Sequence, residues 1–333
     1  MSAQAPSLGP APAYRRAVLM GDPAHFRVQG GANPHTRTRL GTRRHVDRER
    51  AIFQWERLRD ALRDHGVRVI VVPADPGAPG LVYPANAGFV LDVDVERPTR
   101  QKTFYLSNLI ETRAVERPHY ARVLGAAGFR VKEIPAEYRF EGEADFFPAA
   151  DVHLLTHGRL EEQRFVPHLG FPPWKRIYGF RTDARVEAFL ARLVAPRPVV
   201  RIELVLEDHY HGDTAICAFG PRRRHLLVWP PALEPEGLAI LRERFGDHLI
   251  ELSKEDAARY AANSFSLTHG TESLLFMPAG VSERLLGQVR ECGVAPVTLD
   301  VSEFLKKGGG SVKCMIGDLG PVGEGELREP DGA

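Results

Sequence analysis

The chain has 333 residues, of which 43% are hydrophobic and 26% are charged, and its formal net charge at pH 7 is +1. This balance is typical of a soluble enzyme with enough apolar residues for a large core, and the near-zero charge argues against a nucleic-acid or membrane-surface binder. The three cysteines show no Cys-x-x-Cys spacing, which argues against a disulfide framework or a zinc knuckle.

Both ends of the chain have the composition of tails. Residues 1–15 are rich in small residues and proline and lack the apolar segment of a signal peptide, while no apolar run anywhere reaches the length of a membrane span. Residues 321–333 are polar and rich in glycine. We therefore expect a disordered tail over 1–15, one folded domain over 16–320, a second tail over 321–333, and a cytoplasmic protein.

One pattern returns along the domain: an amphipathic helical run ends at a small or charged residue, and a short β-branched strand follows. It occurs at 51–73, 121–135, 184–204, 236–253 and 282–304. Further strand-like stretches are found at 15–22, 86–95, 151–158, 214–220, 225–231 and 273–278. About five such units bury their apolar faces most simply around one axis, with a cleft at the centre. The alternative is an ordinary α/β sandwich whose helices are evenly spaced by coincidence.

Polar clusters fall in the loops between these units, at 21–35, 84–88, 140–145 and 207–215, and a glycine-rich loop lies at 308–320. In the last loop Cys314 follows three glycines and a lysine. Glycines let a ligand approach the backbone closely, so Cys314 is a candidate nucleophile. The other two cysteines, Cys217 and Cys292, are expected to pack in the interior.

His211 and Asp213 stand two residues apart in the segment 207–215. If this segment is extended, both side chains point to one face, where an imidazole can act as an acid–base and a carboxylate can anchor a cation. One alternative is a histidine satisfied within a turn. Another is a metal site made of His209, His211 and Asp213.

Glu141 follows an aromatic residue and precedes Gly142, which allows a sharp turn. A carboxylate at such a turn could orient an imidazole as the third member of a Cys–His–acid set, or it could be a surface charge. Glu143 is expected to be solvated.

Asn86 and Asn33 could make hydrogen bonds at a pocket floor, or could be simple turn residues. Arg181 precedes a predicted helix start at Thr182 and Asp183, where it could clamp a carboxylate or make an exposed salt bridge.

Together and in this order, the motifs resemble those of the guanidino-group-modifying enzymes of the pentein (α/β propeller) fold. These include arginine deiminases, dimethylarginine dimethylaminohydrolases, amidinotransferases and arginine dihydrolases. The resemblance covers about residues 16–320, and its carriers are MGDPAHFRV, NP, PANAGFV, RAVERPHY, FEGEAD, YGFRTD, HGDTA, AANSFSL and FLKKGGGSVKC. Asn-Pro at 33–34 and Ala-Asn-Ala-Gly at 85–88 place it nearest the dihydrolase and bacterial dimethylaminohydrolase branch.

The resemblance implies an α/β fold: a five-fold pseudosymmetric propeller of about five ββαβ-type units around a central active site. It also implies a cysteine hydrolase that cleaves C–N bonds of the guanidinium group of arginine or an Nω-substituted arginine through a covalent thiouronium. The products would be citrulline or ornithine, with ammonia or an amine. In this branch an asparagine at the position of Asn86 goes with a second hydrolysis.

By the same resemblance, Cys314 would be the nucleophile, His211 the general acid–base and Glu141 its partner. The substrate-binding residues would be Asp213, Asn86, Asn33, Arg181 and Asp145. No metal or organic cofactor is required, the partner is a small guanidino substrate rather than a nucleic acid or membrane, and a homodimer is one option for the assembly.

The chain also departs from this branch. Relatives often carry a Cys-Pro-Pro or Cys-Arg-Pro sequence where it has Gly-Asp-Pro at 21–23, and a basic residue where it has Asn108, while 164–177 has the character of an insertion. These differences leave the substrate open. The alternatives are an amidinotransferase, which passes the amidino group to an amine, and a non-catalytic guanidino-binding protein.

Overall fold

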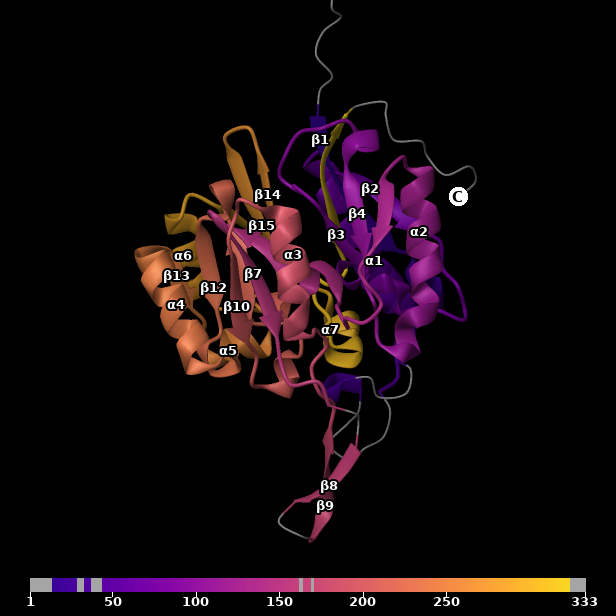
Figure 1. Cartoon of the computed structure of the whole chain (residues 1–333), viewed down its shortest axis with the longest axis vertical. Coiled ribbons are helices and arrows are strands. Elements are labelled where there is room, and N and C mark those ends of the chain that lie inside the picture. Colours follow the sequence, from indigo (N-terminus) through magenta and orange to yellow (C-terminus); the bar gives the residue numbers. More distant parts are fainter. Residues whose placement is uncertain (1–13, 29–32, 37–43, 162–163, 169–170, 324–333) are drawn as a thin grey trace, which may run out of the picture.

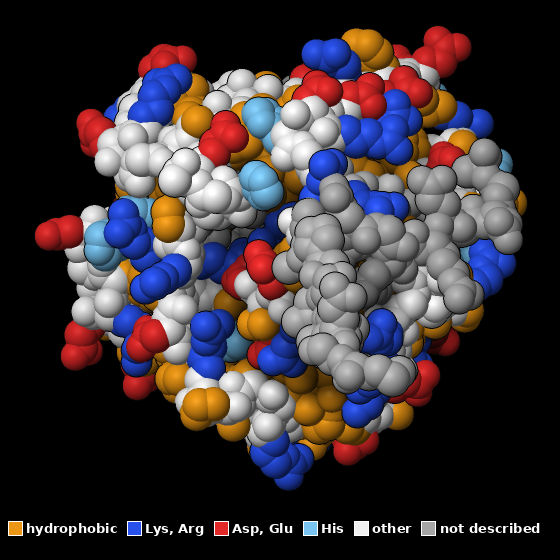
Figure 2. Space-filling model, turned by 90° about the horizontal axis from the view of Figure 1, so that it is seen from above, with side chains coloured by type: hydrophobic (Ala, Val, Ile, Leu, Met, Phe, Trp, Pro, Cys, Tyr) orange, Lys and Arg blue, Asp and Glu red, His pale blue; other side chains and the backbone are white. Residues whose placement is uncertain are grey.

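A computed structural model describes residues 14–28, 33–36, 44–161, 164–168 and 171–323. This part of the chain is a mixed α/β structure with five three-stranded sheets and a separate two-stranded sheet (Figure 1). No helix in it is both long and apolar enough to cross a membrane. Acidic and basic side chains are intermixed over the face seen in Figure 2, as the small net charge predicts.

All five three-stranded sheets share one connection: the first strand is antiparallel to the second, a helix follows, and the third strand is parallel to the second. The first sheet contains β17 (Gly317–Gly323), β1 (Tyr14–Gly21), helix α1 (Arg48–Asp64) and β2 (Arg68–Val72). The second contains β3 (Gly88–Val90), β4 (Thr103–Leu106), α2 (Arg117–Ala126) and β5 (Arg130–Glu133). The third contains β6 (Phe146–Ala149), β7 (Val152–His157), α3 (Glu187–Val194) and β10 (Val199–Glu203). The fourth contains β11 (Ile216–Phe219), β12 (His225–Val228), α4 (Pro235–Phe245) and β13 (Leu249–Glu251). The fifth contains β14 (Phe265–His269), β15 (Glu272–Pro278), α6 (Glu283–Glu291) and β16 (Ala295–Leu299).

Two short helices lie outside this pattern: α5 (Lys254–Ala258) precedes β14, and α7 (Ser302–Gly308) follows β16. Several helices begin at a side-chain cap. The Asp47 carboxylate accepts a hydrogen bond from the amide of Arg50 at the start of α1, and the Ser282 hydroxyl accepts one from the amide of Leu285 at the start of α6.

The apolar core consists of groups of buried side chains that lie between neighbouring sheets. Phe89 of the second sheet packs edge-on against Phe146 of the third, with ring centroids 5.1 Å apart. Other groups join the first sheet to the second, the third to the fourth, and the fourth to the fifth. One more, which includes Val18, Leu58 and Phe276, joins the fifth sheet back to the first. Each sheet is therefore covered on both sides by its neighbours along the chain.

The predicted helices are confirmed in all five units, but several strands were not predicted. The sequence patterns missed β4, β6, β14 and β17, which are the strands that complete the repeated connection. Strand β1 starts at Tyr14 and β17 runs to Gly323, so both cross the predicted domain limits of 16 and 320. The tails themselves lie mostly outside the described residues.

The segment predicted as an insertion forms the hairpin of β8 (Arg164–His168) and β9 (Phe171–Ile177), which projects from the body of the molecule (Figure 1). Arg223 belongs to a run of three arginines at 222–224, and its side chain is largely shielded from solvent. Its guanidinium lies 2.8 Å from the Asp94 carboxylate and 3.0 Å from that of Asp318, because burial favours a paired charge.

Candidate active site

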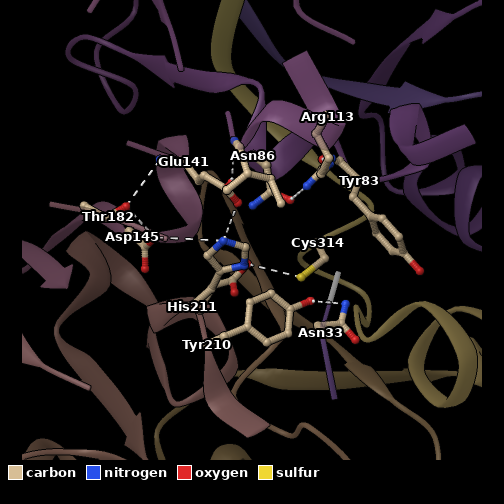
Figure 3. A network of polar contacts seen from close by, with 12 residues as sticks. Asn33, Tyr83, Asn86, Arg113, Glu141, Asp145, Thr182, Tyr210, His211 and Cys314 are labelled. Atoms are coloured by element: carbon tan, nitrogen blue, oxygen red, sulfur yellow. Dashed lines mark hydrogen bonds and ion pairs between the residues drawn. The ribbon is translucent and has the colours of Figure 1, made fainter. Parts of the chain in front are cut away.

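A cavity of about 540 Å³ opens between the loops of different sheets. Its lining includes six residues that are far apart in sequence: Asn33, Asn86, Glu141, Arg181, His211 and Cys314. The structure thus brings together both members of the predicted Cys–His pair and the predicted acid. Figure 3 shows the His211 ring between Glu141 and Cys314.

Cys314 lies in a tight turn between α7 and β17, and its side chain is 2% exposed. The turn depends on the preceding glycines: Gly309 has φ +83°, and a side chain at Gly310 would meet the ring of Tyr83 and the Cβ of Cys314. The sulfur accepts a hydrogen bond from the Asn263 amide at 3.1 Å and lies 3.5 Å from an Asp213 carboxylate oxygen. Burial, and then the charge of Asp213, raise the pKa of Cys314 well above its ordinary value.

His211 is buried and donates from Nε2 to the Glu141 carboxylate at 2.7 Å. The other oxygen of Glu141 accepts from the amide of Ile110 at 3.2 Å, which fixes the carboxylate. Burial opposes charge on both groups. The imidazolium nevertheless lowers the pKa of Glu141 to about 2, and the carboxylates of Asp145, Glu141 and Asp213 together raise the pKa of His211. This pairing keeps His211 able to give up a proton to a leaving group.

Asp213 lies beside the sulfur in a turn, so the condition of an extended segment is not met, because Gly212–Thr214 form one turn of 3₁₀ helix. Its Oδ1 is buried and has no hydrogen-bond partner among the described residues. Burial raises its pKa to about 6. A buried acceptor without a partner, next to a nucleophile, is a place where a cationic ligand fits.

The same turn removes the basis of the alternative metal set. His209 sits in a separate turn with its Nδ1 bonded to the carbonyl of Thr214 at 2.9 Å, so the histidines and Asp213 do not share a strand face. Within the described ranges, no group of three or more His, Cys, Asp or Glu side chains is placed to hold a metal ion.

Asn86 lines the cavity from the short turn before β3, and its amide orientation is fixed by Arg113. Arg113 donates to the Asn86 side chain at 2.6 Å while it also makes two hydrogen bonds with Glu116. A guanidinium has no acceptor, so the atom of Asn86 that faces it must be the oxygen. The Nδ2 group of Asn86 is buried without a partner in the described structure. Asn86, a residue of the cavity wall, therefore retains a buried hydrogen-bond donor that no described residue uses.

Asn33 and Arg181 also line the cavity. The amide of Asn33 donates to the Tyr210 hydroxyl at 3.1 Å and to the carbonyl of Gly308 at 2.9 Å, so it holds the glycine-rich loop. Arg181 is 4% exposed, and its guanidinium lies 5.3 Å from the centre of the Tyr210 ring.

Asp145 does not line the cavity. Its oxygens accept from the hydroxyls of Thr156 and Thr182, both at 2.7 Å, and from the amide of Gly212 at 2.9 Å. It lies 4.0 Å from Nε2 of His211. The predicted direct contact with a substrate is not supported by this geometry, since the carboxylate is occupied in holding the backbone next to His211.

Among the residues that hold the site together, Arg113, Glu116 and Asn263 had no predicted role. All three occur in segments that carried the family resemblance, RAVERPHY and AANSFSL, so the signal was present but unassigned. The prediction that Glu143 is solvated is wrong. It is 8% exposed, pairs with Lys313 at 2.8 Å and accepts from the amide of Asp318 at 2.7 Å. Burial raises its pKa to about 7.

Comparison with known proteins finds similarity to guanidino-modifying enzymes. A profile of the family N,N dimethylarginine dimethylhydrolase, eukaryotic, matches residues 238–320. The chain is 29% identical to the N(G),N(G)-dimethylarginine dimethylaminohydrolase of Mycobacterium tuberculosis, over 92% of this chain and 86% of that protein. It is 27% identical to the bifunctional arginine dihydrolase/ornithine cyclodeaminase AgrE of Nostoc sp., over 90% of this chain. It spans only 37% of the length of AgrE.

The chain also resembles solved structures. The N-terminal domain of ArgZ, a cyanobacterial arginine dihydrolase solved with bound product, has a TM-score of 0.75 to this chain at 25% identity, covering 92% of this chain and 97% of that one. The same domain has also been solved covalently bound to a reaction intermediate. A dimethylarginine dimethylaminohydrolase adduct has a TM-score of 0.64 at 20% identity, which shows a shared fold.

Proposed function

We propose that this chain, a relative of the guanidino-group-modifying enzymes with the pentein fold, is a cysteine hydrolase. It cleaves C–N bonds of the guanidinium group of arginine or an Nω-substituted arginine. The observation that carries the proposal is the buried set of Cys314, His211 and Glu141 around one cavity, together with two unpartnered polar atoms, on Asp213 and Asn86.

The fold explains how such distant residues can meet. We take the five sheets to be arranged around a central axis as an α/β propeller, since each apolar group joins consecutive sheets and the fifth adjoins the first. Loops from successive units then converge at one end of that axis. Each loop contributes one part of the site, as a pseudosymmetric repeat predicts.

The chemistry begins with the charge of the substrate. Burial and Asp213 disfavour the thiolate of Cys314 in the unliganded protein. A guanidinium bound against Asp213 places a positive charge beside the sulfur, which favours loss of its proton. Asp213 thus grips the cation and holds its central carbon near the nucleophile. In this scheme the substrate itself activates the enzyme.

The thiolate then attacks the guanidinium carbon and gives a tetrahedral adduct. His211 donates its proton to the departing amine, and a planar S-alkylthiouronium remains on Cys314. Neutral His211 takes a proton from a water molecule that attacks the same carbon, and the thiolate leaves with formation of a ureido product. Glu141 keeps the imidazole oriented through both steps.

Asn86 extends the proposal to a second hydrolysis. Arg113 binds the oxygen of Asn86, and the free Nδ2 group can only donate. Asn86 therefore cannot accept a hydrogen bond from a guanidinium N–H, and we assign binding of the cation to Asp213 alone. A donor in that place fits the oxygen of a ureido group. The geometry therefore supports retention of the ureido product for a second attack, which would yield an ornithine-type product, ammonia and carbon dioxide.

Arg181 is the residue that we assign to the substrate carboxylate. It lines the cavity, and its guanidinium lies over the Tyr210 ring. A guanidinium is well suited to bidentate binding of a carboxylate.

The test is a product profile. The protein is incubated with arginine, monomethylarginine, dimethylarginine, agmatine and citrulline, each with and without glycine or lysine as an acceptor, and the products are identified by mass spectrometry. Turnover without an acceptor, absent in Cys314→Ala, supports the hydrolase. Products that form only with an acceptor would establish an amidinotransferase instead, and binding without any turnover would establish a non-catalytic protein.

A further inference from the structure

The strongest unassigned feature is Asn263, a fully buried residue between α5 and β14. It ends a tight turn in which its own amide donates to the carbonyl of Tyr260 at 2.8 Å, and Tyr260 has φ +56°. A left-handed conformation at a bulky residue is costly, so the surrounding structure must hold this turn firmly. Asn263 is thus presented to the cysteine loop from a rigid support.

The four hydrogen bonds of the Asn263 side-chain amide all go to the Cys314 loop or to Asp213. Its oxygen accepts from the backbone amides of Ser311 at 3.0 Å and Cys314 at 3.1 Å. Its nitrogen donates to the carbonyl of Asp213 at 3.2 Å and to the sulfur of Cys314 at 3.1 Å. In addition, its backbone carbonyl accepts from the amide of Lys313 at 3.1 Å.

These partners leave one orientation for the amide. Two backbone N–H groups can bond only to the oxygen, and a backbone carbonyl can bond only to the nitrogen. The other three hydrogen bonds of the side chain therefore fix the N–H group that points at the sulfur. A donor held in place before the reaction stabilises developing negative charge without having to reorganise.

We propose that Asn263 is a catalytic residue: its amide N–H stabilises the thiolate of Cys314 while the same side chain holds the cysteine turn in register with Asp213. This role rests on the hydrolase function proposed above, because it concerns the same nucleophile. It also explains why the nucleophile turn and the Asp213 turn, from different sheets, stay aligned: one side chain bonds to both.

The charges around the sulfur make such a donor necessary. The ionisable group that lies against the sulfur is Asp213, while His211, Tyr83 and Tyr210 line the same cavity. The hydroxyls of the nearby tyrosines Tyr83, Tyr210 and Tyr260 are bonded to the carbonyls of Phe304, Gly309 and Asp208. The neighbouring cation, Lys313, is directed away, with its ammonium on Glu143 at 2.8 Å and on the carbonyl of Ile316 at 3.0 Å. Asp213 opposes a thiolate, whereas the Asn263 N–H favours it.

The experiment measures thiol ionisation without a substrate. Cys314 is alkylated with iodoacetamide between pH 6 and pH 10, and the rate is followed on the Cys314 peptide by mass spectrometry in the parent, in Asn263→Asp and in Ser264→Ala. Asn263→Asp keeps an oxygen for the two backbone amides and replaces the donor by an acceptor. Ser264→Ala removes a neighbouring hydroxyl that bonds only to the carbonyl of Ala261 and serves as the control.

We expect Asn263→Asp to slow alkylation about ten- to hundredfold near neutral pH, as for loss of a hydrogen bond to a charged group, and to shift the midpoint to higher pH. Ser264→Ala should match the parent. An unchanged alkylation profile in Asn263→Asp would overturn the proposal. Since no turnover is measured, this outcome is separate from failure of the proposed hydrolase activity.

A second measurement follows the side-chain amide of Asn263 itself, without substituting that residue. The chain contains four asparagines, Asn33, Asn86, Asn108 and Asn263, so selective ¹⁵N labelling gives four pairs of side-chain amide signals. Serine substitutions of the other three, one at a time, assign the signal of Asn263. We expect that signal to titrate with the thiol in the parent and to lose this titration in Cys314→Ala. A signal that does not respond to pH in the parent refutes the hydrogen bond to the thiolate.

Discussion

We expect substitution of Asn86 by aspartate to separate the two proposed hydrolytic steps. The new carboxylate would keep one oxygen on Arg113, in place of the present contact at 2.6 Å, and would turn its other oxygen to the cavity where Nδ2 now lies. A donor thus becomes an acceptor at the atom that we assign to the ureido oxygen. The variant should bind the cationic guanidinium at least as well as the parent, and the neutral ureido group poorly.

The magnitude follows from the contacts. Loss of the donor leaves two acceptors facing each other, which costs about 1–3 kcal/mol, or about 5- to 150-fold in affinity for the ureido group. In the variant, the guanidinium gains a charge-assisted hydrogen bond. Because the new carboxylate is shared with Arg113, we expect this bond to contribute about 1.5 kcal/mol, the lower limit for a hydrogen bond to a charged group. The ratio of ornithine-type to citrulline-type product should therefore fall at least tenfold.

The assay is the product ratio from arginine, determined by mass spectrometry at several time points. Thr112→Asp is the matched control, because Thr112 is an exposed residue of the cavity wall and the change adds the same charge without replacing the Asn86 donor. If Asn86→Asp leaves the ratio untouched, or if Thr112→Asp lowers it equally, the donor assignment is wrong.

The remaining predictions concern the reacting groups and their partners. Cys314→Ala should abolish turnover, and His211→Ala should do so while leaving added mass on Cys314 after an acid quench; residual turnover in Cys314→Ala contradicts covalent catalysis. Arg181→Ala should raise KM about tenfold or more for substrates with an α-carboxylate and leave KM for agmatine unchanged, and equal effects on both would place carboxylate recognition elsewhere. Glu141→Gln should lower the pKa of His211 by about one to two units in an NMR titration, since it removes the charge from a hydrogen bond worth about 1.5–3 kcal/mol, whereas Glu161→Gln, a cavity residue paired with arginines, should not. The pKa of Glu141 is held at about 2, below its ordinary 4.5, so its contribution to stability is complete above pH 4.5 and is lost as the pH falls towards 2. The free energy of unfolding of Glu141→Gln, measured with denaturant, should therefore depend less steeply on pH in that range than that of the parent.

The helices could be predicted because their periodicity is local. Leu58 and Leu62 of α1 follow the spacing of one buried helix face, and the Asp47 cap marks where that helix begins. The strands β6 and β17 could not be predicted in the same way. β6 has the sequence FFPA, and β17, with the sequence GDLGPVG, contains three glycines and a proline, which ordinarily mark loops. Both are strands because a partner pairs with them in the folded structure.

The site residues could be located from the motifs, but not the direction in which their atoms point. Nothing near Asn86 in the sequence reveals that its oxygen is bound, since Arg113 is 27 residues away along the chain. Glu143 has the local pattern of a solvated charge and is buried only because Lys313 reaches it from the other end of the domain. Asn263 has the same limitation, as its four partners come from two distant loops.

The antiparallel pairing of β1 with β17, which sets Tyr14 opposite Gly323, has a consequence for biogenesis. A growing polypeptide can complete four sheets while the first still lacks its outer strand. The turn that carries Cys314 immediately precedes that missing strand, so Cys314 is placed only when β17 pairs with β1. Until then we expect Cys314 to lack its contacts with Asn263 and Asp213. Because these two strand ends lie next to each other, we expect the protein to tolerate circular permutation. A short linker would join them, and the new termini would lie in the β8–β9 hairpin.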